Sequence, residues 1–344
     1  MIGVYYCNYK YMNNKKCKYS GLLSLLLVCI LQTTVIAQDA VYSQFMFDGL
    51  SVNPGLTGIN EYNKFTVGFR DQWVQIPHAY VTYFASYDQY IELYNSGIGF
   101  QAYRDVEGGV YSRTSVEIFY SYRFQVADKT IVSAGLQLAG VQRAFNVEGL
   151  TLPNRNSAYL ENRSSFFPDF GFGAVLNYSD LYSMGFAVHH LNGPVETLSE
   201  INHQRTPMSL SAHFISYFPF RFGRFDRHHF VFSPGVYFRT QQYQDFVSVG
   251  MNLAYDPVFV GLWMRASGGF NPESAIFMIG LELFDCRIAY NYDYKLASMK
   301  NEFPGTGAHE IVLTWKFHPK KQMRAIKCSK FCIDHMNQKS KKKY

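Results

Sequence analysis

Apolar and polar residues alternate along much of the chain. Between positions 115 and 124 they divide into two sets: Val116, Ile118, Tyr120, Tyr122 and Phe124 in one, and Ser115, Glu117, Ser121 and Arg123 in the other. Successive side chains of a β-strand point to opposite faces, so this period of two predicts a strand with one apolar and one polar face. The apolar face suits lipid, and the polar face suits a wet interior.

Fourteen segments of this kind follow one another, separated by residues that favour turns. They are 64–72, 80–88, 97–103, 111–124, 130–142, 169–178, 181–190, 208–217, 230–240, 246–255, 258–265, 274–283, 286–294 and 309–317. Strands of about 10 residues, joined alternately by short and long turns, are typical of outer-membrane barrels, which favour even strand numbers. We therefore predict an all-β fold: a transmembrane antiparallel up-and-down β-barrel of about 14 strands over residues 64–317.

Glycines recur inside the predicted strands, as in Gly97 and Gly99, Gly135 and Gly140, and Gly171 and Gly173. Glycine in a strand permits bends, bulges and the close approach of another backbone, which a closing sheet needs. An alternative for 171–173 is a phosphate-binding loop. Its third glycine and its following helix are both missing from the sequence.

Composition supports a membrane barrel. Aromatic residues make up 17% of the chain and charged residues another 17%, whereas soluble domains have about 25% charged residues. The mean hydropathy is only -0.13, and no apolar run of about 18 residues follows the N-terminal region. A membrane protein with so low a mean hydropathy is consistent with a barrel, because the apolar and polar positions of barrel strands alternate and average out. A soluble β-sandwich that buries its aromatic residues is the alternative.

The N-terminus has the character of an export signal. Lysines precede an apolar stretch at 22–36, and the small residue Ala37 that follows it is suited to cleavage. We predict a signal peptide over residues 1–37 and an N-terminal periplasmic segment over 38–63. A transmembrane anchor is the alternative, although the apolar stretch is short and interrupted at 32–34.

The formal net charge of +6 comes from the two ends of the chain, because acidic residues outnumber basic ones between them. Residues 318–344 are predicted to form a basic C-terminal tail. Such a tail either attracts anionic lipid, peptidoglycan or an acidic protein, or is a solvated end. Its Cys328 and Cys332 can pair in an oxidising periplasm or stay free.

No constellation in the sequence indicates catalysis. His309-Glu310 begins like a zinc-hydrolase motif, but the second histidine would fall at Leu313. The His-His pairs at 189–190 and 228–229 should point to opposite faces of a strand, so neither pair should hold a metal. We predict no enzyme activity, no cofactor and no metal, and expect neither nucleic acid nor a small-molecule substrate as partner.

The longest predicted connections are 146–168 and 191–207, both rich in Asn, Glu, Pro and Ser. Strand parity decides on which side of the membrane each connection lies. The pattern alone does not determine that parity, so their side stays unassigned.

Six short stretches carry a further signal: Tyr42-Ser43-Gln44-Phe45-Met46-Phe47 with Asn53-Pro54-Gly55, Phe69-Arg70-Asp71-Gln72-Trp73, Phe167-Pro168-Asp169-Phe170-Gly171-Phe172-Gly173, His190-Leu191-Asn192, Tyr290-Asn291-Tyr292-Asp293 and His309-Glu310-Ile311. In this order they resemble the PorP/SprF family of type IX secretion and gliding-motility proteins. The motif positions are Asn53, Pro54, Arg70, Gln72, Trp73, Pro168, Asp169, Gly171, Gly173, Asn192, Tyr292, Asp293, His309 and Glu310. Two departures are a serine at 329, where the family often has proline, and Gly55, where alanine is common.

The resemblance implies a barrel in the cell outer membrane that serves type IX secretion or gliding motility. Its partners would be outer-membrane lipid and either periplasmic ring components, to which it docks, or a large secreted surface adhesin, which it anchors. An outer-membrane porin or hydrophobic-substrate transporter is the alternative, since barrels of this size can conduct small molecules.

Arg70 and Gln72 share one face of the first predicted strand. If that face lines the lumen, Arg70 needs a carboxylate partner, because an unpaired buried charge is costly. The candidates are Asp169, Asp293 and Glu310.

Overall fold

A computed structural model of the protein describes residues 48–60, 62–76, 79–146, 162–196, 204–220, 230–242, 244–268, 270–296 and 307–317. The predicted signal peptide and the predicted basic tail lie outside the described residues. So do positions 38–47 of the predicted periplasmic segment and the histidines at 228–229.

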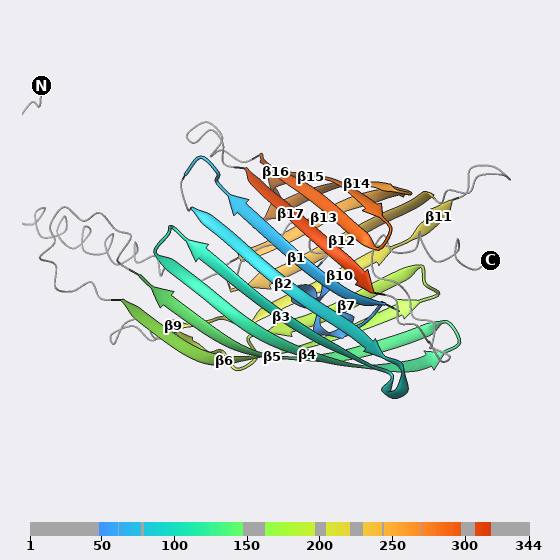
Figure 1. Cartoon of the computed structure of the whole chain (residues 1–344), viewed down its shortest axis with the longest axis horizontal. Coiled ribbons are helices and arrows are strands. Elements are labelled where there is room, and N and C mark those ends of the chain that lie inside the picture. Colours follow the sequence, from blue (N-terminus) through green and yellow to red (C-terminus); the bar gives the residue numbers. More distant parts are fainter. Residues whose placement is uncertain are drawn as a thin grey trace, which may run out of the picture. The chain divides into compact units, whose positions relative to one another are not determined.

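All fourteen predicted strands are present and antiparallel (Figure 1). They are β1 Asn63–Gln72, β2 Tyr80–Ile91, β3 Ser96–Glu107, β4 Tyr111–Ala127, β5 Thr130–Phe145, β6 Arg163–Tyr178, β7 Tyr182–His189, β10 Ser209–Ser216, β12 Phe230–Gln241, β13 Gln244–Tyr255, β14 Val258–Ser267, β15 Asn271–Leu283, β16 Cys286–Lys295 and β17 Ala308–Phe317. The short elements are α2 Gly49–Val52, η1 Pro54–Leu56, η2 Glu92–Tyr94, β8 Val195–Glu196, β9 Gln204–Arg205 and β11 Phe218–Phe220. Within the described ranges, no helix has the length and apolar character needed to span a bilayer.

The strands close into a ring. The first strand, β1, pairs along its whole length with the last strand, β17. Halfway round, β10 joins β7 to β12. A closed ring leaves no sheet edge, so the backbone groups of the wall can be satisfied within the wall, as a lipid-embedded sheet requires. The predicted fold class, an antiparallel barrel of 14 strands, is confirmed.

A proline explains the one extra short strand in the wall. β11 continues β10 in the same register against β12, since the pairs Ile215–Gly235 and Phe218–Phe232 belong to one ladder. Pro234 of β12 lies opposite the interruption and has no N–H to donate to the ladder.

The predicted alternation holds in β4. Val116, Ile118, Tyr120, Tyr122 and Phe124 are each 40–54% exposed on the outer face, whereas Ser115, Glu117, Ser121 and Arg123 are at most 6% exposed on the inner face. We expected the inner face to line a wet lumen. Its side chains are polar as predicted, but they are buried against each other and against the N-terminal segment.

The N-terminal segment differs from the prediction of a separate periplasmic segment at 38–63. Residues 48–60, which we call the plug, contain α2 and η1. The plug lies inside the ring, in blue in Figure 1, against the inner faces of β3 to β7. Amide and carbonyl groups spaced along a turn carry no hydrophobic periodicity, so the strand pattern could not reveal this location.

The strand β6 begins at Arg163, six positions before the predicted start at Asp169. The composition of 146–168 predicts a connection that ends at Pro168. At Pro168, β6 is paired only with β5, because β7 pairs with β6 only from Phe172 onward. The side of β6 that faces away from β5 therefore needs no N–H donor at this position, and a proline is tolerated there.

Strand direction now places the connections. The start of β1 and the end of β17 lie at one end of the barrel, together with the turns at 128–129, 256–257 and 284–285. The strand ends that flank the two longest connections lie at the opposite end: the end of β5 and the start of β6 for one, and the end of β7 and the start of β10 for the other. We call these the short-turn end and the long-loop end.

Candidate functional site

The motif residues Asn53 and Pro54 form the centre of the plug. Asn53 Oδ1 accepts a hydrogen bond from the Gly55 N–H at 2.8 Å and so caps η1. Its Nδ2 donates to the carbonyl oxygens of Ala174 on β6 and Phe186 on β7, both at 3.1 Å. A single carboxamide therefore ties the plug to two neighbouring strands, which only a side chain with both a donor and an acceptor can do.

Glycines of the sheet make room for the plug. A Cβ at Gly173 would lie 2.0 Å from Asn53 Oδ1, and a Cβ at Gly135 would lie 2.2 Å from the Pro54 carbonyl carbon. Gly135 and Gly173 are also register partners on β5 and β6. The close approach of backbones that strand glycines permit is thus realised here. The alternative of a phosphate-binding loop at 171–173 is wrong, because these residues lie within β6.

Polar side chains of three other strands hold the rest of the plug. The hydrogen bonds run from Gln101 Nε2 to Asp48 Oδ2 (2.7 Å), from the Gly58 N–H to Asp88 Oδ2 (3.1 Å) and from Ser121 Oγ to the Thr57 carbonyl (2.8 Å). Sequence reasoning missed Gln101, Asp88 and Ser121 as site residues. The one available signal was their position on the polar face, beside or opposite strand glycines such as Gly97.

Arg70 forms the buried ion network that the sequence predicts. Its Nη1 lies 2.9 Å from Glu310 Oε2, and its Nη2 lies 3.1 Å from Asp293 Oδ2. Arg265 on β14 approaches the same Asp293 oxygen at 3.7 Å. Gln72 shares the lumen face and accepts a long hydrogen bond, 3.4 Å, from Arg70. Two arginines and two carboxylates therefore neutralise each other inside the wall.

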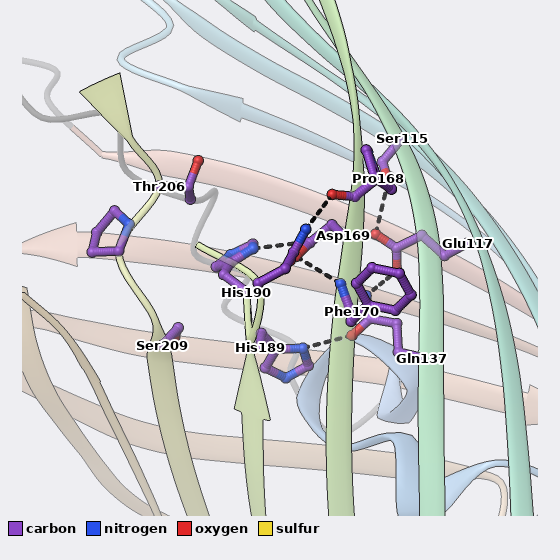
Figure 2. Close-up of polar contacts among 12 residues, drawn as sticks. Ser115, Glu117, Gln137, Pro168, Asp169, Phe170, His189, His190, Thr206 and Ser209 are labelled. Carbon is purple, nitrogen blue, oxygen red and sulfur yellow. Dashed lines mark hydrogen bonds and ion pairs between the residues drawn. The ribbon is translucent and has the colours of Figure 1, made fainter. Parts of the chain in front are cut away.

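Asp169, the third predicted partner of Arg70, belongs to a different cluster, shown in Figure 2. Its Oδ2 lies 2.7 Å from His190 Nδ1, and both side chains are buried. Next to it, Asn192 Nδ2 donates to the Pro168 carbonyl at 2.7 Å. The two motifs at 167–173 and 190–192 thus meet across β6 and the end of β7.

The two adjacent histidines do not point to opposite faces, contrary to the prediction. His189 Nδ1 lies 2.7 Å from Gln137 Oε1, so both rings turn toward the β5–β6 wall (Figure 2). His190 follows the end of β7 and has a φ of 59°, which breaks the strand alternation. From Gln137 the hydrogen bonds continue to Glu117, at 3.0 Å. No motif in the sequence had marked Gln137 or Glu117.

Three motif residues lie apart from these inner networks. Tyr292 and His309 lie on the outer face, where their rings are 5.0 Å apart and His309 Nδ1 lies 2.6 Å from Tyr290 Oη. Trp73 follows β1 with a φ of 64°, and its backbone N–H donates to the Gly307 carbonyl at 2.9 Å. These contacts join β1, β16 and β17 at the long-loop end.

Within the described ranges, no cluster of three or more His, Cys, Asp or Glu side chains is arranged to hold a metal ion. The inner networks are paired charges and hydrogen-bonded amides. Such an arrangement holds a wall and a plug in one geometry.

Solved structures with similar barrels come from several sources. They include the Pseudomonas putida toluene transporter TodX (10% identity, TM-score 0.46, over 82% of this chain and 95% of that chain) and a Pseudomonas aeruginosa FadL homologue (13% identity, TM-score 0.42, over 75% and 90%). A third is the KdgM porin (6% identity, TM-score 0.35, over 74% and 99%). Likenesses at this level say nothing about substrate. No curated protein matches the chain.

One family covers most of the sequence. Residues 34–315 match the family described as type IX secretion system membrane protein PorP/SprF. The matched range takes in the plug, the ion network of Arg70 and nearly the whole ring of strands. The chain therefore belongs to the PorP/SprF family of type IX secretion system membrane proteins, and is a β-barrel of the outer membrane.

Proposed function

We propose that this barrel is a docking component of the type IX secretion or gliding-motility machinery, with no enzyme activity of its own. It would dock periplasmic ring components or anchor a large secreted surface adhesin. Membership of the family supports an association with the secretion machinery. The observation that favours docking over conduction is the plug, which occupies the lumen and is hydrogen-bonded to the wall.

A diffusion pore needs a continuous wet path, whereas the inner side chains at the level of the plug are buried. Asn53 and Gln101 are 0% exposed, and Asp48 is 2% exposed. The hydrogen bonds that these buried groups make with one another and with the wall hold the plug and the wall in one geometry. A rigid wall presents its loops and turns to a partner with little loss of conformational entropy on binding.

Affinity purification of the tagged protein from native outer membranes tests the proposal. We expect ring components or a secreted adhesin to be recovered in stoichiometric amounts, and the identity of the recovered protein distinguishes the two docking roles. Recovery of neither, from membranes that retain the barrel, would contradict the proposal.

Planar-bilayer conductance tests the alternative. The purified barrel should be nearly silent, because the plug lies inside the ring and paired charges line the wall beside it. Steady, solute-selective conductance of the unmodified protein would favour the porin or transporter instead.

A further inference from the structure

The outward side chains of β1 to β6 form rows across the sheet, and two neighbouring rows differ in character. One row is apolar: Val67, Ala85, Ala102, Val116, Gly140 and Pro168. The next row toward the long-loop end contains Phe69, Tyr83, Arg104, Thr114, Gln142 and Phe166. Hydrocarbon favours the first row and head groups favour the second, so the boundary between them marks the edge of the apolar layer.

Arg104 differs from the other arginines of β1 to β5. Those at 70, 113 and 123 are buried in the lumen, and Arg143 turns to Glu196, whereas Arg104 is exposed on the outer face. Across the described ranges, the side chain of Arg104 makes no hydrogen bond or ion pair. The side chains of Thr114 and Gln142, its neighbours in the row, likewise make none there. A cation with two polar neighbours thus faces the lipid side of the wall.

We propose that Arg104, Thr114 and Gln142 form a binding site for the phosphorylated head group of a glycolipid in the outer leaflet. Barrels have short periplasmic turns and longer extracellular loops, so the long-loop end faces outward, and the row lies at the level of the outer leaflet. The guanidinium of Arg104 can bind phosphate oxygens in bidentate fashion. The hydroxyl of Thr114 and the carboxamide of Gln142 can bind sugar hydroxyls.

The dimensions fit a sugar-phosphate head group. The three side chains stand on adjacent strands, β3, β4 and β5, which lie side by side in the foreground of Figure 1. Neighbouring strands are about 4.8 Å apart, so the row spans roughly 10 Å. Tyr83 and Phe166, 51% and 74% exposed, flank the row. Aromatic rings at this depth are suited to the boundary between acyl chains and head groups.

The experiment compares the wild-type barrel with Arg104→Gln in detergent, with purified lipid A as the probe. Binding is measured by native mass spectrometry. We expect Arg104→Gln to bind lipid A about fivefold more weakly, since one arginine near an anionic surface contributes on that scale. The matched control is Arg205→Gln: Arg205 is also exposed and lies at the long-loop end, but it belongs to β9 rather than the wall. It should bind like wild type.

Two further probes make the result specific. Dephosphorylated lipid A should bind wild type and Arg104→Gln equally, and inorganic phosphate alone should not raise the unfolding temperature of the wild-type barrel. Equal binding of phosphorylated lipid A to wild type and Arg104→Gln would overturn the proposal. So would stabilisation by inorganic phosphate as large as that by lipid A. Arg104→Gln should fold like wild type, because Arg104 is exposed on the outer face. Heat-modifiability on gels checks that the variant barrel is folded.

Discussion

Arg70 on the first strand and Glu310 on the last strand are register partners across the seam that closes the barrel, and they form a buried ion pair at 2.9 Å. They are 240 positions apart in the sequence. Asp293, on the next strand of the ring, binds the same guanidinium. The network can therefore form only when the two ends of the sheet have met, which couples charge pairing to closure.

Replacing Arg70 by alanine should destabilise the barrel. It leaves Glu310 and Asp293 buried with too little positive charge, and breaking a buried pair in this way costs about 3–5 kcal/mol. The unfolding temperature in detergent, read from heat-modifiability on gels, should fall clearly. The double variant Arg70→Ala, Glu310→Ala should lose less than the sum of the two single losses.

Arg104→Ala is the matched control for Arg70→Ala, because Arg104 is an exposed arginine on the outer face. Its unfolding temperature in the same detergent should stay close to that of wild type. An equal drop for both arginine variants would mean that the Arg70 network adds nothing to stability.

Gly135→Ala should displace the plug, whereas Gly140→Ala on the same strand should not. The new Cβ at 135 would meet the Pro54 backbone at 2.2 Å, but at 140 it would meet only the tip of the Phe166 ring, at 3.0 Å. Overpacking of the first kind costs about 1–3 kcal/mol. Planar-bilayer conductance should rise for Gly135→Ala alone, and a rise in both variants would contradict the proposed fit of the plug.

Asn53→Asp should be more damaging than Asn53→Ala. The aspartate can still accept from the Gly55 N–H, but it replaces the donor to Ala174 and Phe186 with an oxygen that faces two carbonyls. A buried group left unsatisfied costs about 1–3 kcal/mol, and more when it is charged. Limited proteolysis of the plug measures the effect. Greater protection in Asn53→Asp than in Asn53→Ala would refute this role.

Asp48 should make the plug more stable in acid. Burial raises the pKa of this carboxyl, against the opposing hydrogen bonds from Ser51 and Gln101. A raised folded-state pKa gives stability that is fully present below the ordinary carboxyl pKa of about 4 and is lost as the pH rises through the folded value. Asp48→Asn removes this titration, so the stability of wild type relative to Asp48→Asn, measured from pH 3 to 8, should decline. A stability difference between the two proteins that stays constant with pH would contradict this role of Asp48.

The wall of the barrel could be predicted from local pattern because strand faces alternate with a period of two. In β4, the five outward residues from Val116 to Phe124 and the inward Ser115 and Glu117 were assigned to the correct faces. Parity likewise put Arg70 and Gln72 on one face, and the structure shows that this face lines the lumen. Parity could not choose among the three carboxylate candidates for Arg70. Asp169 points inward like Asp293, but it lies across the ring, where it pairs with His190.

By itself, the sequence determined the fold class, the fourteen strands and the two faces of β4, because these follow from contacts between near neighbours and from the difference between lipid and lumen. Only the tertiary structure decided that residues 48–60 lie inside the barrel and that Gly135 and Gly173 receive Pro54 and Asn53. These contacts join positions that are distant along the chain. They arise from shape and from individual hydrogen bonds, which leave no periodic trace in the order of the residues.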